Sequence, residues 1–203
     1  RVDVRELGCD LLAFSAHKMG GPMGIGVLWG KPEVLDAMPP FLTGGEMIES
    51  VTRTGAVYAE LPHKFEAGTV NAAGAAGLAA AIRYVQSVGF DTIQQREHDL
   101  TANALARVLA VPHVHVLGTD RPEDHNGIIT FTVDGVHPHD ISEIMASDGV
   151  NIRAGHHCAQ PLLTWLGVEN LACCRASVAF YNDKADIDKF IAGLHHVWST
   201  FNG

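Results

Sequence analysis

A lysine near the start of the chain lies in a setting that could bind an aldehyde cofactor. Lys18 ends the run Phe14-Ser15-Ala16-His17-Lys18, which follows an apolar segment and is followed closely by two glycines. A lysine that faces a pocket at the end of a buried strand loses solvation, and its amine becomes a nucleophile able to form a Schiff base. Ser15 and His17 could donate hydrogen bonds to the cofactor's phosphate. Without other signals, the same pattern fits better with an exposed lysine in a turn.

A cysteine in the second half of the chain has the setting of a reactive thiol. Cys158 lies in the segment 153–161, Arg-Ala-Gly-His-His-Cys-Ala-Gln-Pro. Neighbouring imidazoles in a glycine-containing loop provide the accessible, electropositive surroundings that favour a thiolate. A buried structural cysteine is one alternative, and a zinc site made of His156, His157 and Cys158 is another. Adjacent residues rarely supply three ligands to one tetrahedral ion, so the spacing favours a nucleophile.

Two further motifs could bind anions. Arg175 opens a predicted strand, and a rigidly held guanidinium can bind a carboxylate through two parallel hydrogen bonds. A surface salt bridge is an equally good explanation of this arginine. Gly68 and Thr69 precede a predicted helix, where backbone N–H groups and a hydroxyl could bind phosphate. An ordinary helix N-cap would explain the same two residues.

The composition restricts the class of protein. The net charge is −9 and no cluster of Lys and Arg occurs, which argues against a nucleic-acid-binding surface. Long apolar runs are interrupted before they could span a membrane, and the first residues do not resemble a signal peptide. The four cysteines lack the spacing of a disulfide framework and favour a reducing compartment. We therefore expect a cytoplasmic protein with neither nucleic acid nor membrane as a partner.

The histidines leave one alternative of a different class. There are twelve, and many occur in close pairs, at 137/139, 156/157 and 195/196. A metal-binding or scaffold module could use such pairs. Their spacing is poor for a single tetrahedral ion, so we expect no metal site.

The apolar segments and the breakers between them predict strands followed by helices. The predicted strands cover residues 11–15, 24–29, 114–117, 128–133, 150–153 and 175–180. The predicted helices cover residues 74–88, 91–109, 139–148 and 184–201, and Gly89 follows the first of them as a C′ glycine. Residues 38–71 contain Pro and Gly with little periodicity and predict long loops. A domain boundary is expected between residues 85 and 90.

In this order, the four motifs resemble those of the SufS-type (group II) cysteine desulfurases, within the class V aminotransferase-like, fold type I enzymes that use pyridoxal 5'-phosphate (PLP). The likeness runs from residues 2–4 and 11–18 to residues 181–182, and segment 153–161 is its most specific part. Segment 153–161 separates this branch of the family from the IscS/NifS-like branch, whose cysteine loop is longer. The resemblance implies an α/β fold. Residues 1–86 would be the C-terminal part of the PLP-binding large domain, and residues 87–203 a small α+β domain with the cysteine loop.

The resemblance assigns a role to each residue of the cofactor site. It implies that Lys18 carries PLP and that Ser15 and His17 bind its phosphate. Thr69, with Gly68, would reach the phosphate in the neighbouring protomer's site, which implies a homodimer. Val70 stands where the family usually has proline in its Gly-Thr-Pro-Asn loop.

The resemblance also implies the reaction and its partners. Cys158 would take the sulfur of L-cysteine as a persulfide and release L-alanine. Arg175 would hold the substrate carboxylate, with Arg153 and His156 lining the same pocket. His139 would meet a sulfur acceptor of SufU or SufE type, which supplies iron–sulfur cluster assembly. Selenocysteine lyase and cysteine sulfinate desulfinase activities are the alternatives within the same scaffold.

Several of the family's cofactor residues do not occur in this sequence. An Asp that pairs with the pyridine nitrogen, a His that stacks on the ring and another phosphate-binding Thr are expected before Arg1. The chain is therefore expected to be the C-terminal half of a longer protein and, alone, to bind PLP poorly and to be inactive. The resemblance implies no role for Cys173 and Cys174.

Overall fold

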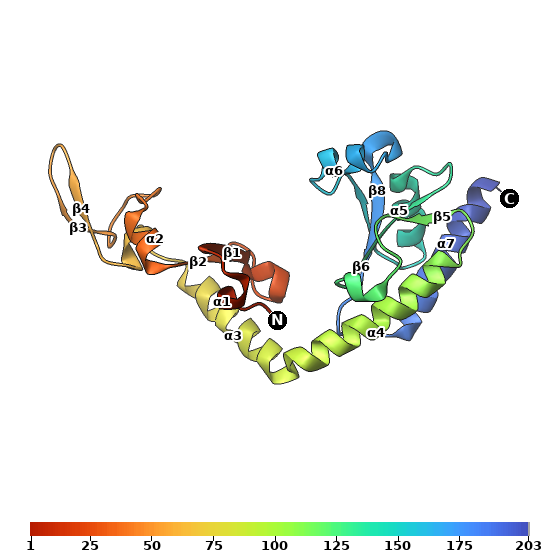
Figure 1. Cartoon of the computed structure of the whole chain (residues 1–203), viewed down its shortest axis with the longest axis horizontal. Helices are drawn as coiled ribbons and strands as arrows, with labels where there is room; N and C mark the ends of the chain where they lie inside the picture. The colour runs from red at the N-terminus through yellow and green to blue at the C-terminus, as the bar shows by residue number, and fades with distance from the viewer. Residues whose placement is uncertain (203) are drawn as a thin grey trace. The chain divides into compact units, whose positions relative to one another are not determined.

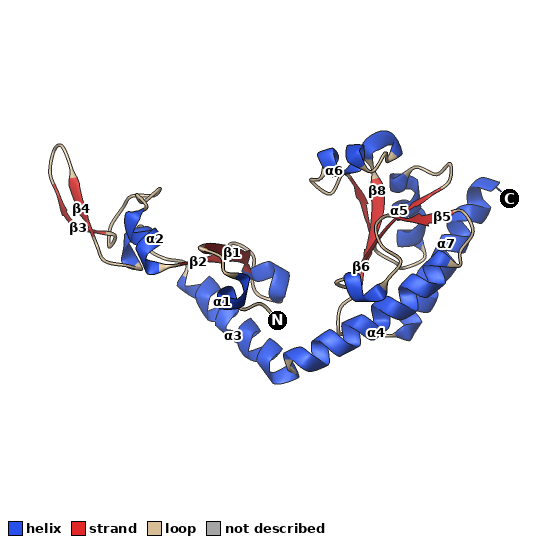
Figure 2. Ribbon diagram, in the orientation of Figure 1, coloured by secondary structure: helices blue, strands red, loops and turns tan. Residues whose placement is uncertain are grey.

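The computed structural model describes residues 1–202, and the chain divides into two compact units, one running to Phe90 and the other starting at Asp91. Figure 1 labels the elements of both units, and Figure 2 separates their helices from their strands. The predicted domain boundary between residues 86 and 87 stays a prediction.

The first unit combines two antiparallel strand pairs with helices. Its elements are α1 (Val4–Leu7), β1 (Leu11–Ser15), the 3-10 helix η1 (Ala16–Met19), β2 (Gly26–Gly30), α2 (Pro32–Ala37), β3 (Ile48–Val51), β4 (Ala56–Tyr58), the 3-10 helix η2 (His63–Phe65) and α3 (Ala72–Val88). Strand β1 pairs with β2 from Leu11 opposite Gly30 to Ser15 opposite Gly26. The prediction for β1 is confirmed, and β2 begins two residues later than predicted.

The prediction of long loops over residues 38–71 is wrong in part, because this segment also contains two strands. Strands β3 and β4 form an antiparallel hairpin, and the Thr52 N–H closes its turn by donating to the Gly55 carbonyl at 2.8 Å. Nearly every residue of the two strands is exposed. Without a buried face, the hairpin has none of the polar–apolar alternation that marks a strand in a sequence.

Helix α3 is delimited by a cap at each end. The Asn71 side chain accepts a hydrogen bond from the Gly74 N–H at 2.9 Å, so the helix begins two residues before its predicted start. Gly89 has a φ of 89° and donates its N–H to the Val85 carbonyl, which confirms it as the residue that ends the helix.

The second unit is one antiparallel sheet with helices packed against it. Its elements are α4 (Phe90–Leu109), β5 (Val114–Val116), η3 (Pro122–Asp124), β6 (Ile128–Val133), α5 (Pro138–Ser147), β7 (Arg153–Gly155), α6 (Gln160–Trp165), η4 (Glu169–Leu171), β8 (Cys173–Ser177) and α7 (Lys184–Asn202). The strand order is β5-β6-β8-β7. Helices α4 and α7 run side by side in Figure 1, and Arg107 and Asp188 form an ion pair between them at 2.5 Å.

The core of this unit lies between helices α4, α5 and α7 and one face of the sheet. Phe131 is fully buried there and meets the ring of Phe190 edge to face. Cys174 points into the same core, and its thiol donates to the Pro138 carbonyl at 3.4 Å. Because side chains alternate along a strand, Arg175 lies on the opposite face of the sheet. Arg153, opposite Arg175 in β7, lies on that same face.

Three predicted strands of this unit have different bounds in the structure; β5 differs only by ending one residue earlier, at Val116. The segment predicted as a strand over 150–153 pairs only from Arg153 onward, and the predicted strand over 175–180 starts earlier, at Cys173. Val150 and Ile152 are apolar because they pack against the core, without belonging to the ladder. Apolar character alone therefore misplaced the strand predicted over 150–153.

Candidate functional site

The turn that carries Lys18 is held by its backbone. Strand β1 runs directly into η1, and Ala16 between them is fully buried. The Ala16 N–H donates to the Ile25 carbonyl at 3.0 Å, and the Gly21 N–H donates to the Ala16 carbonyl at 2.9 Å. A Cβ on Gly21 would lie 2.9 Å from that same carbonyl oxygen, so the turn needs glycine there. These contacts fix the direction of the residues in between.

The side chains of His17 and Lys18 are exposed on this turn. The described residues alone do not enclose the Lys18 amine, so its place in a pocket stays a prediction for the longer protein. Within residues 1–202, Lys18 has no hydrogen-bond or ion-pair partner, and the half-buried Ser15 precedes it in β1. An amine without a partner, followed directly in sequence by neither an acid nor a base but preceded by a hydroxyl and an imidazole, provides the groups that PLP needs: a nucleophile for its aldehyde and donors for its phosphate.

The Gly68–Thr69 segment lies three residues before α3. Gly68 has a left-handed φ of 74°, and its N–H already donates to the Gly45 carbonyl at 2.9 Å. This N–H is not free for a phosphate, so Gly68 contributes through its conformation, whereas the exposed Thr69 hydroxyl stays a candidate. The helix cap proper is Asn71, whose Nδ2 also donates to the Gly24 carbonyl at 3.2 Å.

The loop between β7 and α6 places Cys158 in an unusual backbone conformation. His157 and Cys158 have φ values of 54° and 58°, both in the left-handed region. Such conformations cost of order 1–3 kcal/mol each for residues with a side chain and tend to occur at functional sites. The Ala159 N–H closes the turn by donating to the His156 carbonyl at 2.9 Å. Cys158 is exposed, with a free thiol.

The other cysteines do not present a comparable thiol. Cys173 and Cys174 are fully buried. Burial, and then the neighbouring Cys173, raise the pKa of Cys174 to about 12, so it stays protonated. Burial also raises the pKa of Cys173, against a smaller opposing effect of the Arg175 charge. Cys9 is half-buried. Cys158 is therefore the thiol best placed to react.

A hollow of about 700 Å³ lies beside the cysteine loop. It brings His139 of α5 together with three predicted residues of the cysteine segment, Arg153, His156 and Cys158, whereas Arg175 does not line it. His137 and His157 also line it, and neither is among the site residues that the resemblance implied. The hollow therefore combines a thiol, a guanidinium and several imidazoles.

His139 lies in the first turn of α5, which begins at Pro138, one residue before its predicted start. His137 is the N-cap residue of this helix, and its Nδ1 accepts from the His139 N–H at 3.3 Å. The two rings meet edge to face with centroids 5.2 Å apart. Proline at the first helical position, Pro138, was the sequence signal that could have identified His137 as the cap. His139 thus both begins the helix and faces the hollow.

Arg153 and Arg175 lie opposite each other on neighbouring strands β7 and β8. Like charges directly opposite in a sheet repel, so a pair of guanidinium groups in register is unfavourable unless an anion binds between or beside them. The Nε atom of Arg175 is buried and has no hydrogen-bond partner within the described residues. This arrangement is suited to a carboxylate.

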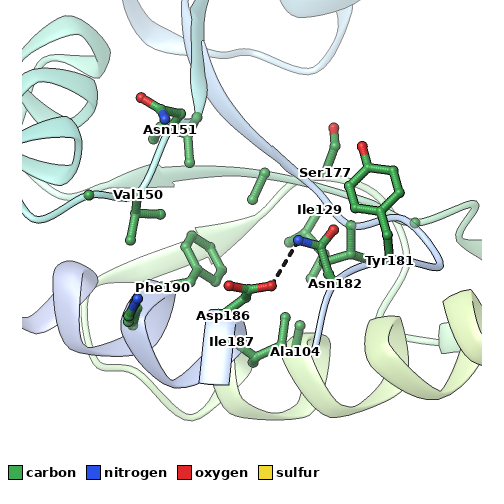
Figure 3. Close-up of a pocket in the computed structure, with 16 residues that line it drawn as sticks. Ala104, Ile129, Val150, Asn151, Ser177, Tyr181, Asn182, Asp186, Ile187 and Phe190 are labelled. Carbon is green, nitrogen blue, oxygen red and sulfur yellow. Dashed lines mark hydrogen bonds between the residues drawn. The ribbon is translucent and has the colours of Figure 1, made fainter. Parts of the chain in front are cut away.

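A separate hollow of about 460 Å³ opens elsewhere on the second unit, and Figure 3 shows its lining. Ile129, Ile187 and Phe190 form an apolar floor, and Asp186 accepts from the Asn182 Nδ2 at 3.0 Å at its edge. None of the residues predicted from the sequence lines this hollow. The candidate chemistry is therefore concentrated at the cysteine loop.

No group of three or more His, Cys, Asp or Glu side chains within residues 1–202 is arranged to hold a metal ion. No helix there is both long and apolar enough to cross a membrane.

The chain matches the aminotransferase class-V family over residues 1–190. A probable cysteine desulfurase of Halalkalibacterium halodurans is 48% identical over 201 residues, which are 99% of this chain and 48% of that protein. The crystal structure of the cysteine desulfurase CsdA from Escherichia coli superposes with a TM-score of 0.90 at 37% identity, over 98% of this chain and 48% of CsdA. A mutant of C-DES, solved with glycine covalently linked to its PLP cofactor, superposes with a TM-score of 0.78 at 26% identity, over 95% of this chain and 47% of C-DES.

The chain belongs to the aminotransferase class-V family. It spans about half the length of the curated relatives that it matches. The superposition on CsdA confirms the predicted fold class of a fold type I enzyme with mixed helices and strands. The roles of individual site residues remain predictions.

Proposed function

We propose that the protein to which this chain belongs is a PLP-dependent cysteine desulfurase of SufS type, acting on L-cysteine. The observation that carries this proposal is the exposed Cys158 on a left-handed loop, in one hollow with His139, Arg153 and His156. The similarity to proteins described as cysteine desulfurases supports it. The PLP bound to C-DES supports the choice of cofactor.

In this proposal the first unit holds the cofactor. The Lys18 amine binds PLP and moves the α-proton of the substrate at its Nζ atom. Ser15, His17 and Thr69 donate to the phosphate, and Gly68 shapes the loop that presents Thr69. Bound PLP supplies an electron sink for the carbanion character that develops at the substrate α-carbon. If Thr69 serves the neighbouring protomer, the protein is a homodimer.

The second unit performs the sulfur chemistry. The Cys158 thiolate attacks the sulfur of L-cysteine, a sulfur–sulfur bond forms, and the carbon–sulfur bond of the substrate breaks. The products are a Cys158 persulfide and, after protonation, L-alanine, so atoms and electrons balance without an external oxidant. Arg175 binds the substrate carboxylate through its guanidinium, and Arg153 and His156 line the same pocket.

The persulfide is then transferred to a protein acceptor. We place this step in the cytoplasm, with an acceptor of SufU or SufE type that delivers sulfur to iron–sulfur cluster assembly. His139 shares the hollow with Cys158, where it can meet the acceptor. Neutral imidazole is a good zinc ligand. At a zinc-containing acceptor, His139 can replace a cysteine ligand and free that thiolate to receive sulfur.

The experiment uses the full-length protein with PLP bound. Cys158→Ser should abolish the formation of L-alanine from L-cysteine and leave the cofactor absorbance unchanged. Mass spectrometry of the wild-type protein after incubation with L-cysteine should find the additional sulfur on Cys158. A persulfide on Cys173 or Cys174, or full activity in the serine variant, would refute the proposal.

A further inference from the structure

His157 precedes the reactive cysteine, and the proposed reaction gives it no role. Its ring is partly buried, and its Nε2 lies 3.0 Å from the backbone carbonyl oxygen of Cys173 in strand β8. A carbonyl oxygen only accepts hydrogen bonds, so Nε2 carries the proton and donates. This bond attaches the cysteine loop to the neighbouring strand.

The protonation of the ring follows from its surroundings. Burial lowers the pKa of His157, and the positive charges of Arg175 and Arg153 lower it further; the bond to Cys173 opposes them more weakly than burial acts. At neutral pH the imidazole is therefore uncharged. Because its single N–H is on Nε2, the Nδ1 atom is a hydrogen-bond acceptor with a free lone pair.

Two buried polar atoms near this loop have no partner among residues 1–202. One is Nδ1 of His157, an acceptor, and the other is Nε of Arg175, a donor. A buried polar atom without a hydrogen bond costs roughly 1–3 kcal/mol, so each needs an explanation. His157 is bonded to the carbonyl of Cys173, and Arg175 follows Cys173 by two residues in β8 with its side chain on the same face of the sheet. Because one atom is an acceptor and the other a donor, a hydrogen bond between them would satisfy both.

We propose that His157 is a positioning residue that connects Arg175 to the Cys158 loop. In the free chain the two atoms are unpaired; when a bound carboxylate orders Arg175, His157 Nδ1 accepts a hydrogen bond from Arg175 Nε–H while its Nε2 stays bonded to the Cys173 carbonyl. The inference rests on the proposed function, in which Arg175 binds the substrate carboxylate and Cys158 attacks the sulfur. A bound carboxylate orders Arg175, Arg175 then holds the His157 ring, and the ring holds the left-handed backbone that presents the Cys158 thiol.

The test compares three variants of the full-length, PLP-loaded protein. His157→Leu removes both ring contacts, His157→Gln keeps an amide that can donate and accept, and His195→Leu is a control at an exposed histidine of α7. His157→Leu should lower kcat for alanine formation by about 100-fold, the usual scale for a misplaced reacting group. KM for L-cysteine, the cofactor absorbance and its change on adding L-cysteine should stay near wild type. His157→Gln should recover most of the lost rate, and His195→Leu should match wild type.

A second readout does not depend on activity. Iodoacetamide should alkylate Cys158 about tenfold faster or slower in His157→Leu than in wild type, because the left-handed loop is no longer held. The proposal would be overturned if Cys158 in His157→Leu were alkylated at the wild-type rate. It would also be overturned if kcat of His157→Gln were as low as that of His157→Leu. Loss of the cofactor absorbance in both variants would also overturn it, since His157 would then support the fold in general.

The link to Arg175 is tested by a double-mutant cycle. Arg175→Lys keeps a positive charge and lacks the Nε–H donor, so the losses caused by Arg175→Lys and His157→Leu should be less than multiplicative in the double variant. Fully multiplicative losses would refute the connection. Wild-type protein that makes no alanine would refute the proposed function alone, and the alkylation rates would still decide the role of His157.

Discussion

The sharpest prediction concerns the reactivity of the three cysteines of the second unit. Native full-length protein treated with iodoacetamide at pH 8 should be alkylated at Cys158 and remain unmodified at Cys173 and Cys174. Cys158 is exposed, and the other two side chains are fully buried. Access therefore favours Cys158.

The size of the effect follows from the burial of Cys174. Burial first, and Cys173 second, raise its pKa to about 12. At pH 8 a thiol with this pKa is about one part in ten thousand thiolate, compared with roughly a quarter for an ordinary thiol whose pKa is ~8.5. Ionisation alone thus slows alkylation of Cys174 roughly 10³-fold, before its lack of access is counted.

The assay is a time course of alkylation followed by digestion and mass spectrometry of each cysteine peptide. Protein unfolded in guanidinium chloride is the control, and there all three cysteines should react at similar rates. If Cys174 in the native protein reacted within tenfold of Cys158, the second unit would not be packed as described. The assignment of Cys158 as the accessible nucleophile would then be wrong as well.

The remaining predictions concern the cofactor, the acceptor and pH. Lys18→Ala in the full-length protein should remove the absorbance of covalently bound PLP, and a borohydride-reducible link that survived would refute Lys18 as the attachment site. His139→Ala should greatly reduce turnover with a SufU-like acceptor but not with a small-molecule reductant; equal effects would leave His139 a structural role. Burial lowers the pKa of His157 in the folded protein, so below pH ~6.5 the unfolded chain binds a proton at this imidazole more readily than the folded chain does. The contribution of neutral, buried His157 to the free energy of unfolding is therefore complete above pH ~6.5 and is lost on acidification. The melting temperature should fall more between pH 7 and pH 5.5 in wild type than in His157→Gln, and parallel curves would contradict this.

Short contiguous motifs were enough for the family and the fold class. Segment 153–161 and the run ending at Lys18 are local in the sequence, so their residue types carry the resemblance without any knowledge of packing. Strand β6 was also predicted with its observed bounds, because Ile129, Phe131 and Val133 alternate with polar residues and face the core. The β3–β4 hairpin was missed because an exposed hairpin buries no face and leaves no such pattern.

The arrangement around the cysteine depends on contacts that no local pattern contains. Arg153 meets Arg175 through the register of β7 and β8, and a slip of one residue would move Arg153 to the other face of the sheet. His139 reaches the hollow of Cys158 because α5 and the cysteine loop pack around the same end of that sheet. The bond from His157 to the Cys173 carbonyl requires both the left-handed loop and the neighbouring strand. Register and loop conformation are set by burial across the whole unit, so the chemistry of single residues could be predicted while their grouping could not.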